Sequence, residues 1–289
     1  MKKPFQYRNL KPSELTEMYL AFRQAFSDYP VAFKLTKEQF VRKFVEKLKI
    51  DFSLSIGAFQ SNALAGFIFT SVNYYENKLS AYNGGTGVRP AYRGNRLTQK
   101  MYDYLKPLLL QRDVKQCVLE VLVENERAIT AYHRVGFEKT KRFKCFKLVN
   151  ERLIKPSINE NLSLYSVSQP RWALYNNFSD VDPSFLDSDR MITQNLANEE
   201  VIEAHLGDEC VGYAIYQPLF GRIGQLAVHP DFRKQGIGSA LVNHVFNKSK
   251  LKGLTVININ EEAKETVRFY KQMGFQNQLD QYEMILTLD

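Results

Sequence analysis

The sequence contains one series of short motifs twice. The run VRPAYRG begins at Val88 and the run VHPDFRK begins at Val228. Each is followed by a tyrosine shortly before Gly-Phe, in YHRVGF from Tyr132 and in YKQMGF from Tyr270, at nearly the same spacing. Two unrelated short matches would not keep this distance, so the chain is predicted to be built from a duplicated unit.

Both copies predict the same order of elements. Two alternating apolar runs around Ser61-Asn62, and two around Gly207-Asp208, indicate a hairpin in each copy. After the hairpin come a strand, the loop with its helix, a short β-branched strand and a small helix before Gly-Phe. Pro107 is expected to kink or end the helix of the first copy. The predicted fold class is α/β (mixed α+β), with a twisted mixed sheet flanked by helices in each domain.

The predicted boundaries give a domain over residues 1–154, a linker over residues 155–161 and a second domain over residues 162–289. The run NERLIKPSINENLS is polar and contains proline, as is typical of linkers. The first domain begins with two amphipathic segments, PSELTEMYLAFRQAF and TKEQFVRKFVEKLK, whereas the start of the second is less regular. A pocket covered by these segments is expected to be better developed in the first domain.

The composition supports packed domains and selects no ligand. Of 289 residues, 44% are hydrophobic and 13% aromatic, which suffices for two cores. The net charge of +8 is compatible with an anionic ligand, an acidic substrate or nucleic acid. Cys117, Cys145 and Cys210 lie far apart, so neither a disulfide framework nor a metal site is expected. The N-terminus has no apolar signal region and no run is long enough to cross a bilayer, so we expect a cytoplasmic protein without membrane contact.

The loop of the second copy has the features of a diphosphate-binding site. It runs from Arg233 to Gly238 as RKQGIG and lies between an apolar strand and a helical pattern. The N-terminus of a helix has unpaired N–H groups and a partial positive charge, and glycine lets the backbone approach a phosphate closely. The patterns G-x-G-x-x-G and G-x-x-x-x-G-K-S/T are absent, which disfavours the nucleotide-binding folds that carry them.

Together these motifs resemble the GNAT N-acetyltransferases, through a V-x-P strand end, R-x-x-G-x-G and a downstream tyrosine shortly before Gly-Phe. The resemblance covers nearly the whole chain as two tandem GNAT-like domains. It implies acetyl-coenzyme A as the donor, a primary amine of a small molecule or peptide as the acceptor, and direct attack of the amine on the thioester. It also implies a strand edge splayed open by a bulge, where the pantetheine arm pairs with free backbone groups.

The resemblance implies coenzyme-binding residues in both copies. In the second copy they are Leu226, Ala227, Val228, Arg233, Lys234, Gln235, Gly236, Ile237, Gly238 and Ser239. In the first copy they are Thr86, Gly87, Val88, Arg93, Gly94, Asn95, Arg96, Leu97, Thr98 and Asn125. There Arg96 and Thr98 stand where the family has small residues. The family register N-x-x-A-x-x-x-Y is kept from Asn125 to Tyr132, but the second copy departs from it at Ala263 and Thr266. Either both copies bind the coenzyme, or one completes the acceptor pocket of the other.

Acetyl transfer needs a neutral amine, a donor to the developing oxyanion and an acid for the leaving thiolate. By the resemblance, Tyr132 and Tyr270 occupy the position of that acid, although each also fits a core aromatic residue. The candidate acceptor contacts in the first copy are Phe26, Asp28, Tyr29 and Glu120. Asp28 and Glu120 are also candidate acid–base groups. The strand GRIGQLAV of the second copy has no carboxylate, so no base is identified there.

Other functions stay open at this stage. A non-catalytic acyl-coenzyme A sensor or scaffold would bind the donor without turnover. The basic run EKTKRFKCFKLVNERLIK could bind RNA, but its alternation of basic residues with Phe143 and Phe146 fits better a final strand with one solvated face, so nucleic acid is disfavoured as a partner. The final strands could also pair between two chains, which leaves a homodimer open.

Overall fold

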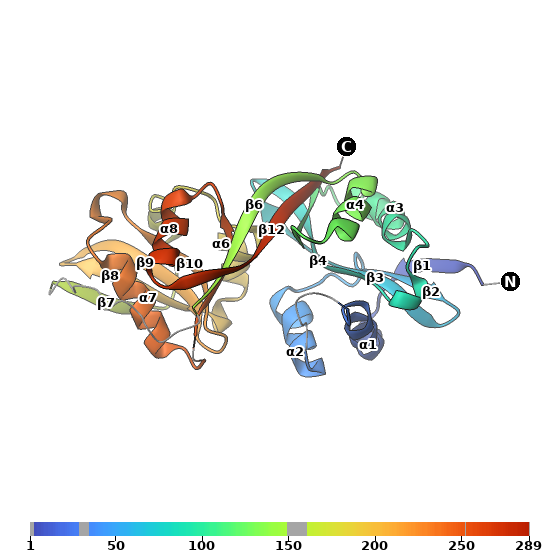
Figure 1. Ribbon diagram of the computed structural model, residues 1–289, viewed down its shortest axis with the longest axis horizontal. Helices are drawn as coiled ribbons and strands as arrows, with labels where there is room; N and C mark the ends of the chain where they lie inside the picture. Colours follow the sequence, from blue (N-terminus) through green and yellow to red (C-terminus); the bar gives the residue numbers. More distant parts are fainter. Residues whose placement is uncertain (1–2, 29–34, 149–160, 252, 289) are drawn as a thin grey trace. The chain divides into compact units, whose positions relative to one another are not determined.

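The computed structural model describes residues 3–28, 35–148, 161–251 and 253–288, and the chain forms two compact units. Unit 1 takes its residues from Met1–Thr140 and Glu283–Asp289, and unit 2 from Lys141–Tyr282. The last strand of each copy therefore runs into the unit formed by the other copy (Figure 1). Most of the predicted linker, residues 155–160, lies outside the described residues, and the boundaries proposed from the sequence stay a prediction.

Unit 1 is a mixed sheet in the order β1-β2-β3-β4-β5-β12. Its strands are β1 (Phe5–Asn9), β2 (Ile56–Gln60), β3 (Ala63–Tyr75), β4 (Lys78–Val88), β5 (Gln116–Leu122) and the end of β12 (Phe275–Thr287). The strands β1 to β4 are antiparallel, and β4 pairs with β5 in parallel. Figure 1 shows α1 (Leu15–Ala25) and α2 (Lys37–Val41) on one face and α3 (Leu97–Leu110) and α4 (Glu126–Val135) on the other.

The helices of unit 1 follow from helical spacing of apolar residues. Helix α1 buries Met18, Ala21, Phe22 and Ala25, which lie on one face. Helix α3 likewise buries Leu97, Met101, Leu105 and others, as expected. The sequence predicts that Pro107 kinks or ends this helix; it does not end it, because α3 continues to Leu110. Pro107 lies in the last turn, so α3 ends three residues after the hydrogen bond that the proline removes.

Unit 2 repeats this arrangement in the order β6-β11-β10-β9-β8-β7. Its strands are β6 (Glu138–Leu148, of which residues 141–148 belong to this unit), β7 (Leu162–Val167), β8 (Glu200–Leu206), β9 (Glu209–Gln217), β10 (Arg222–Val228) and β11 (Thr255–Asn260). Its helices are α5 (Trp172–Tyr175), α6 (Asp189–Gln194), α7 (Ile237–Lys248) and α8 (Lys264–Gln272). The strands β10 and β11 are parallel, and the other pairs from β7 to β10 are antiparallel. Both predicted hairpins are present, with their turns at Ser61-Asn62 and Gly207-Asp208.

The layer between the sheet and the first helices differs in chemistry between the units. In unit 1 it is a cluster of buried phenylalanine rings with centroids 4.4 to 6.3 Å apart. They are Phe22, Phe40, Phe44, Phe67 and Phe69. In unit 2 the same layer contains Tyr175 stacked on Tyr213, with ring centroids 3.9 Å apart. Within the described ranges, none of the helices combines the length and the apolar character that a membrane span requires.

Candidate active site

A parallel pair of strands separates in each unit and opens a wedge. In unit 1, the pairing of β4 with β5 extends as far as Tyr82, and β4 continues to Val88. In unit 2, the pairing of β10 with β11 extends as far as Ile223, and β10 continues to Val228. These are the splayed strand edges expected from the sequence. Backbone groups along such an edge can pair with an extended ligand.

A glycine bulge lies at the start of each wedge. The register between β3 and β4 shifts at Gly84, and the register between β9 and β10 shifts at Gly224. A Cβ atom on Gly84 would lie 2.0 Å from Leu48 Cδ2, and one on Gly224 would lie 3.2 Å from Asp187 Oδ1. A bulge bends its strand and ends regular pairing, which accounts for the position of the wedge.

The loop after each wedge strand has the same backbone conformation in both units. In unit 1, Gly94 has φ +82° and Arg96 has φ +54°. In unit 2, Lys234 has φ +63° and Gly236 has φ +82°. The two left-handed positions therefore recur at the same places, but glycine occupies the first in unit 1 and the second in unit 2. Helices α3 and α7 begin directly after the second position, so their unpaired N–H groups lie at the loop.

A pocket of about 750 Å³ in unit 1 is formed by the loop, the end of β4 and α4. Twelve residues proposed from the sequence line it, namely Phe26, Asp28, Thr86, Gly87, Val88, Arg93, Gly94, Arg96, Leu97, Thr98, Asn125 and Tyr132. Arg127 and Arg134 add positive charge beside Glu124 and Glu126. Among the described residues, Asn95 and Glu120 do not line the pocket, and Tyr29 lies outside the described residues.

The two candidate acid tyrosines have different surroundings. Tyr132 of α4 lines the pocket, and its side chain is 8% exposed. Tyr270 of α8 is 2% exposed, and its ring packs against Phe146, Phe269 and Phe275 with centroids 5.2 to 5.9 Å apart. Burial raises the pKa of Tyr270 above its ordinary value. In the described structure, Tyr132 is therefore the tyrosine shown to reach a pocket.

The candidate carboxylates of unit 1 are already engaged. Asp28 is bound by both Nη atoms of Arg93, and these hydrogen bonds lower the pKa of Asp28 to about 2. Glu120 of β5 accepts a hydrogen bond from Tyr82 of β4, at the point to which the pairing of the two strands extends. Asn125, a candidate coenzyme contact, caps α4 by accepting a hydrogen bond from the Ala128 N–H.

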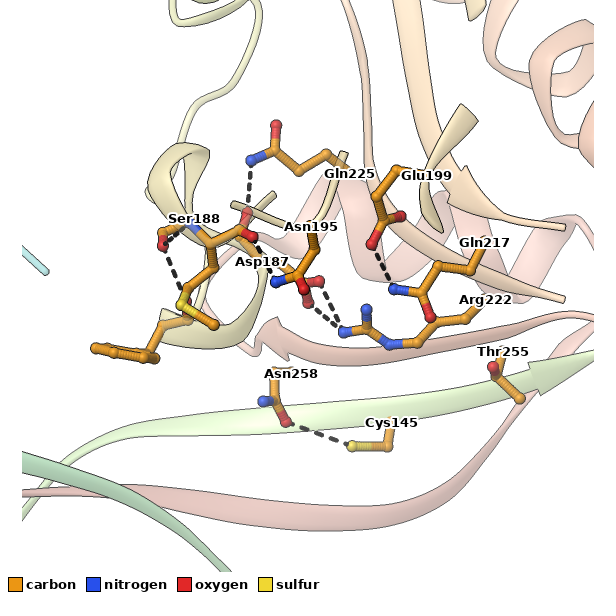
Figure 2. A network of polar contacts seen from close by, with 12 residues as sticks. Cys145, Asp187, Ser188, Asn195, Glu199, Gln217, Arg222, Gln225, Thr255 and Asn258 are labelled. Atoms are coloured by element: carbon orange, nitrogen blue, oxygen red, sulfur yellow. Dashed lines mark hydrogen bonds and ion pairs between the residues drawn. The ribbon is translucent and has the colours of Figure 1, made fainter. Parts of the chain in front are cut away.

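In unit 2 the bulge lies beside a buried polar network (Figure 2). Arg222 of β10 donates to Asp187, and its Nη2 lies 2.7 Å from both carboxylate oxygens. Gln225 of β10 donates to the Asp187 carbonyl oxygen at 2.6 Å and accepts a hydrogen bond from the Tyr213 hydroxyl at 2.8 Å. The Arg222 and Asp187 side chains are 12% and 4% exposed, so this ion pair is largely enclosed next to Gly224.

A second carboxylate of unit 2 is buried in an ion-pair network. Glu203 accepts hydrogen bonds from Arg171 and Tyr175, and lies 2.9 Å from His205 Nε2. Burial alone would raise the pKa of Glu203, but its hydrogen bonds, first among them those from Arg171, hold it below the ordinary value. Glu203, His205 and Cys210 bring ligand atoms within 4.8 Å of one another. Because Arg171 already neutralises Glu203, a further cation would meet a positive charge there.

Two regions of the chain match acetyltransferase profiles. The profile described as the acetyltransferase (GNAT) family matches residues 16–137, and the one described as an acetyltransferase (GNAT) domain matches residues 197–277. Together they take in more than half of the chain, with one match in each copy. The chain belongs to the GNAT family. The tandem GNAT arrangement predicted from the sequence is thereby confirmed.

Two curated relatives of this GNAT protein match over short stretches. A peptidyl-lysine N-acetyltransferase of Salmonella typhimurium is 44% identical over 69 residues, which are 24% of this chain and 43% of that protein. An uncharacterized N-acetyltransferase of Methanocaldococcus jannaschii is 38% identical over 56 residues, which are 19% of this chain and 25% of that protein. The matches therefore span less than half the length of either relative.

Solved GNAT structures share the whole fold. A GCN5-related N-acetyltransferase from Sphaerobacter thermophilus has a TM-score of 0.74 at 14% identity, covering 99% of this chain and 97% of that chain. A tandem GNAT protein from the clavulanic acid biosynthesis pathway has a TM-score of 0.73 at 11% identity, covering 99% of both chains. At these identities the likeness concerns the fold alone, and it confirms the mixed α+β class.

Sequence reasoning missed the polar network of the second GNAT domain. The strand GRIGQLAV has no carboxylate, and the carboxylate of this network, Asp187, comes from a 3-10 turn, η4 (Phe185–Asp187), in the irregular segment before β8. A usable signal was present in the strand itself. Arg222 and Gln225 are polar residues in an apolar strand, and buried polar groups require partners.

Proposed function

We propose that this protein transfers an acetyl group from acetyl-coenzyme A to a primary amine and that unit 1 carries out the reaction. The observation that supports this most is the pocket of unit 1, which joins the loop, the end of β4 and Tyr132 in one space. In this proposal the N–H groups from Gly94 to Thr98 bind the pyrophosphate, and the backbone from Thr86 to Val88 pairs with the pantetheine arm. The side chains of Arg127 and Arg134 add attraction for the phosphates.

The reaction is an exchange of a C–S bond for a C–N bond. When bound, acetyl-coenzyme A supplies the thioester carbonyl that the amine attacks. A backbone N–H at the end of β4 donates a hydrogen bond to the carbonyl oxygen as it becomes negative. The Tyr132 hydroxyl donates a proton to the sulfur as the C–S bond breaks, so that coenzyme A leaves as a thiol. The nitrogen loses one proton and becomes an amide, and a proton from solvent then restores the Tyr132 hydroxyl.

We assign the acceptance of that proton to Glu120 rather than to Asp28. Asp28, with a pKa of about 2 beside Arg93, is too weak a base for an amine at neutral pH. Glu120 lies on β5 outside the lining of the pocket and is joined to β4 through Tyr82, so it can accept the proton only through water. Proton transfer from the amine to Glu120 passes through one water molecule in this proposal. Phe26 lines the same pocket and is proposed as an acceptor contact.

The test is an assay of coenzyme A thiol release with a panel of amines. The name of the Salmonella relative makes a lysine-containing peptide the first acceptor to try. Spermidine, an aminoglycoside and free amino acids complete the panel. Tyr132→Phe is expected to lower kcat at least about 100-fold with an unchanged Kd for acetyl-coenzyme A, since general acids contribute about 10²- to 10⁴-fold. A loss of turnover in Tyr270→Phe but not in Tyr132→Phe would move the reaction to unit 2.

A second candidate function applies to unit 2. The burial of Tyr270 among aromatic rings favours a domain that binds an acyl-coenzyme A through its loop without turnover. In that case Tyr132→Phe should remove nearly all amine-dependent thiol release, while acetyl-coenzyme A still binds to unit 2. Residual turnover that depends on Tyr270 would exclude a purely binding role for this domain.

A further inference from the structure

We propose that the first arginine of each loop, Arg93 in unit 1 and Arg233 in unit 2, is a positioning residue and not a phosphate ligand. Each connects the end of the wedge strand to the segment after the first helix of its unit. The inference deepens the proposed function and rests on it, because it assigns a role to residues around the proposed coenzyme site.

In unit 1 the guanidinium of Arg93 holds three groups. Its Nη1 and Nη2 donate to the two carboxylate oxygens of Asp28 at 2.5 and 2.8 Å. Its Nη2 also donates to the Ala25 carbonyl oxygen at 3.0 Å, and its Nε donates to the Val88 carbonyl oxygen at 3.3 Å. Ala25 is the last residue of α1, where helix carbonyl groups have no partner within the helix. Val88 is the last residue of β4.

In unit 2 the guanidinium of Arg233 repeats this pattern atom by atom. Its Nη1 and Nη2 donate to the Asp180 carboxylate at 2.7 and 3.1 Å. Its Nη2 donates to the Phe178 carbonyl oxygen at 2.8 Å, and its Nε donates to the Val228 carbonyl oxygen at 3.1 Å. Phe178 and Asp180 follow α5, as Ala25 and Asp28 belong to the end of α1 and the turn after it. The two copies differ at most other positions around the loop, so the repeat indicates a selected role.

The number of N–H groups that Arg93 and Arg233 already use favours a positioning role over phosphate binding. A guanidinium has five N–H groups. In both units four donor contacts are made to Asp, to the carbonyl group near the first helix and to the carbonyl group of the strand. The planar fork is matched to the carboxylate, a geometry that a lysine does not reproduce. To bind a phosphate with its fork, the arginine would have to give up these contacts.

The consequence is a coupling between the donor side and the acceptor side of unit 1. Val88 lies at the end of the strand proposed to bind the pantetheine arm, and Asp28 lies in the segment proposed to contact the acceptor. Coenzyme bound along β4 and the loop fixes Arg93, and Arg93 in turn fixes the end of α1. The donor would therefore order the acceptor side before the amine binds.

The test is amide hydrogen exchange of the whole protein, titrated with coenzyme A. Peptides over residues 94–101 report binding at the loop of unit 1, and peptides over residues 20–28 report the end of α1. Arg93→Gln is expected to keep the Kd read from residues 94–101 within threefold of wild type. It is expected to raise the exchange of residues 20–28 at least fivefold and to abolish the protection of these residues by coenzyme A.

Three further variants test whether the exchange of residues 20–28 depends on the contact between Arg93 and Asp28. Asp28→Asn breaks the other end of the contact and should give the same exchange pattern as Arg93→Gln. Arg93→Lys keeps the positive charge but cannot bind both carboxylate oxygens of Asp28 in the same planar geometry. Coenzyme A should therefore not protect residues 20–28 in this variant either. Arg233→Gln should change residues 172–180 of unit 2 and leave residues 20–28 as in wild type.

The results that would overturn the coupling alone differ from the result that would overturn the proposed function. A Kd that rises more than threefold in Arg93→Gln would make this side chain a phosphate ligand and end the inference, as would unchanged exchange at residues 20–28. An increase in coenzyme affinity in Asp28→Asn would also contradict it, because the released arginine would then bind phosphate. Absence of any coenzyme protection at residues 94–101 in wild type would overturn the proposed function and the inference with it.

Discussion

Single residues of the loop show how two different sequences adopt one backbone. The left-handed positions are occupied by Gly94 and Arg96 in unit 1 and by Lys234 and Gly236 in unit 2. A residue with a Cβ atom pays about 1–2 kcal/mol in this conformation, and glycine does not. Each loop thus places glycine at one of the two positions and accepts strain at the other. The missing glycines of the first copy therefore do not change the shape of its loop.

Replacing Gly236 in the loop of unit 2 should introduce backbone strain at the second left-handed position as well. Gly236→Ala is expected to lower the free energy of unfolding of unit 2 by about 1 kcal/mol, because φ is +82° at this position. Urea unfolding followed by hydrogen exchange measures this for each unit separately. Arg96→Ala is the matched control, since its position already carries a Cβ atom and the strain is unchanged. Equal effects of the two substitutions would contradict this explanation.

The contact between Arg93 and Asp28 predicts a pH dependence. Arg93 lowers the pKa of Asp28 to about 2 from an ordinary value of 3.8, so the unfolded chain binds this proton more readily than the folded chain. The stabilisation is therefore present above about pH 4 and is lost as the pH falls toward about 2. The stability difference between wild type and Asp28→Asn should be constant from pH 5 to 7 and should shrink below pH 4. It should be small, because the Asp28 side chain is 57% exposed. A difference that grows on acidification would refute this assignment.

Whole elements were largely predictable from periodicity. The hairpins, the helices α1, α3 and α7 and the buried strands follow from apolar spacing of two or of three to four residues. The unit 1 pocket was approached through the family motif, and twelve residues proposed from the sequence line it. Arg222 and Gln225 signal that a polar partner exists, but its identity as Asp187 was not predictable, because Asp187 lies in an irregular turn distant in sequence from the strand. Periodicity states which face of a strand is buried but not which polar partner covers it.

The layer between the sheet and the first helices can be tested by adding a hydroxyl in one unit and removing one in the other. Phe67 lies opposite Gly87 in unit 1, and Tyr213 lies opposite Ala227 in unit 2, at corresponding places in the strand pairs. Tyr213→Phe removes the hydroxyl that donates to Gln225, and a buried acceptor left without its donor costs about 1–3 kcal/mol.

The complementary substitution is Phe67→Tyr. It places a hydroxyl among phenylalanine rings and should also destabilise its unit by about 1–3 kcal/mol. Thermal unfolding of the two variants, with exchange read separately in each unit, measures both effects. A neutral result for Phe67→Tyr would mean that the phenylalanine layer of unit 1 already contains a polar partner.

At the scale of the whole molecule, the boundaries of the two compact units differ from the boundary between the two sequence copies. The pattern of alternating residues at 142–149 and 281–288 predicts a final strand in each copy, and β6 and β12 are present. Alternation does not specify the neighbour of a strand. Residues 283–289 belong to unit 1 and residues 141–148 belong to unit 2, so each unit depends on a strand encoded with the other copy.

Removal of residues 283–289 should therefore unfold unit 1, although unit 1 is otherwise encoded by the first half of the chain. In unit 1 the segment supplies Glu283, which accepts hydrogen bonds from Tyr75 at 2.7 Å and from Thr140 at 2.8 Å, and the Leu288 N–H, which donates to the Lys115 carbonyl oxygen at 2.9 Å. It also buries Met284, Leu286 and Leu288.

Losing three buried aliphatic side chains costs about 2–5 kcal/mol each, which with the lost hydrogen bonds is comparable to the total stability of about 5–15 kcal/mol of an ordinary domain. Hydrogen exchange of a chain ending at Tyr282 should show unit 1 unprotected while the core of unit 2 around Leu241 and Val245 stays protected. Glu283→Gln is the milder control and should destabilise unit 1 without unfolding it. If residues 1–140 stayed protected in the shortened chain, unit 1 would be complete without the exchanged strand, and the division into units would follow the repeat after all.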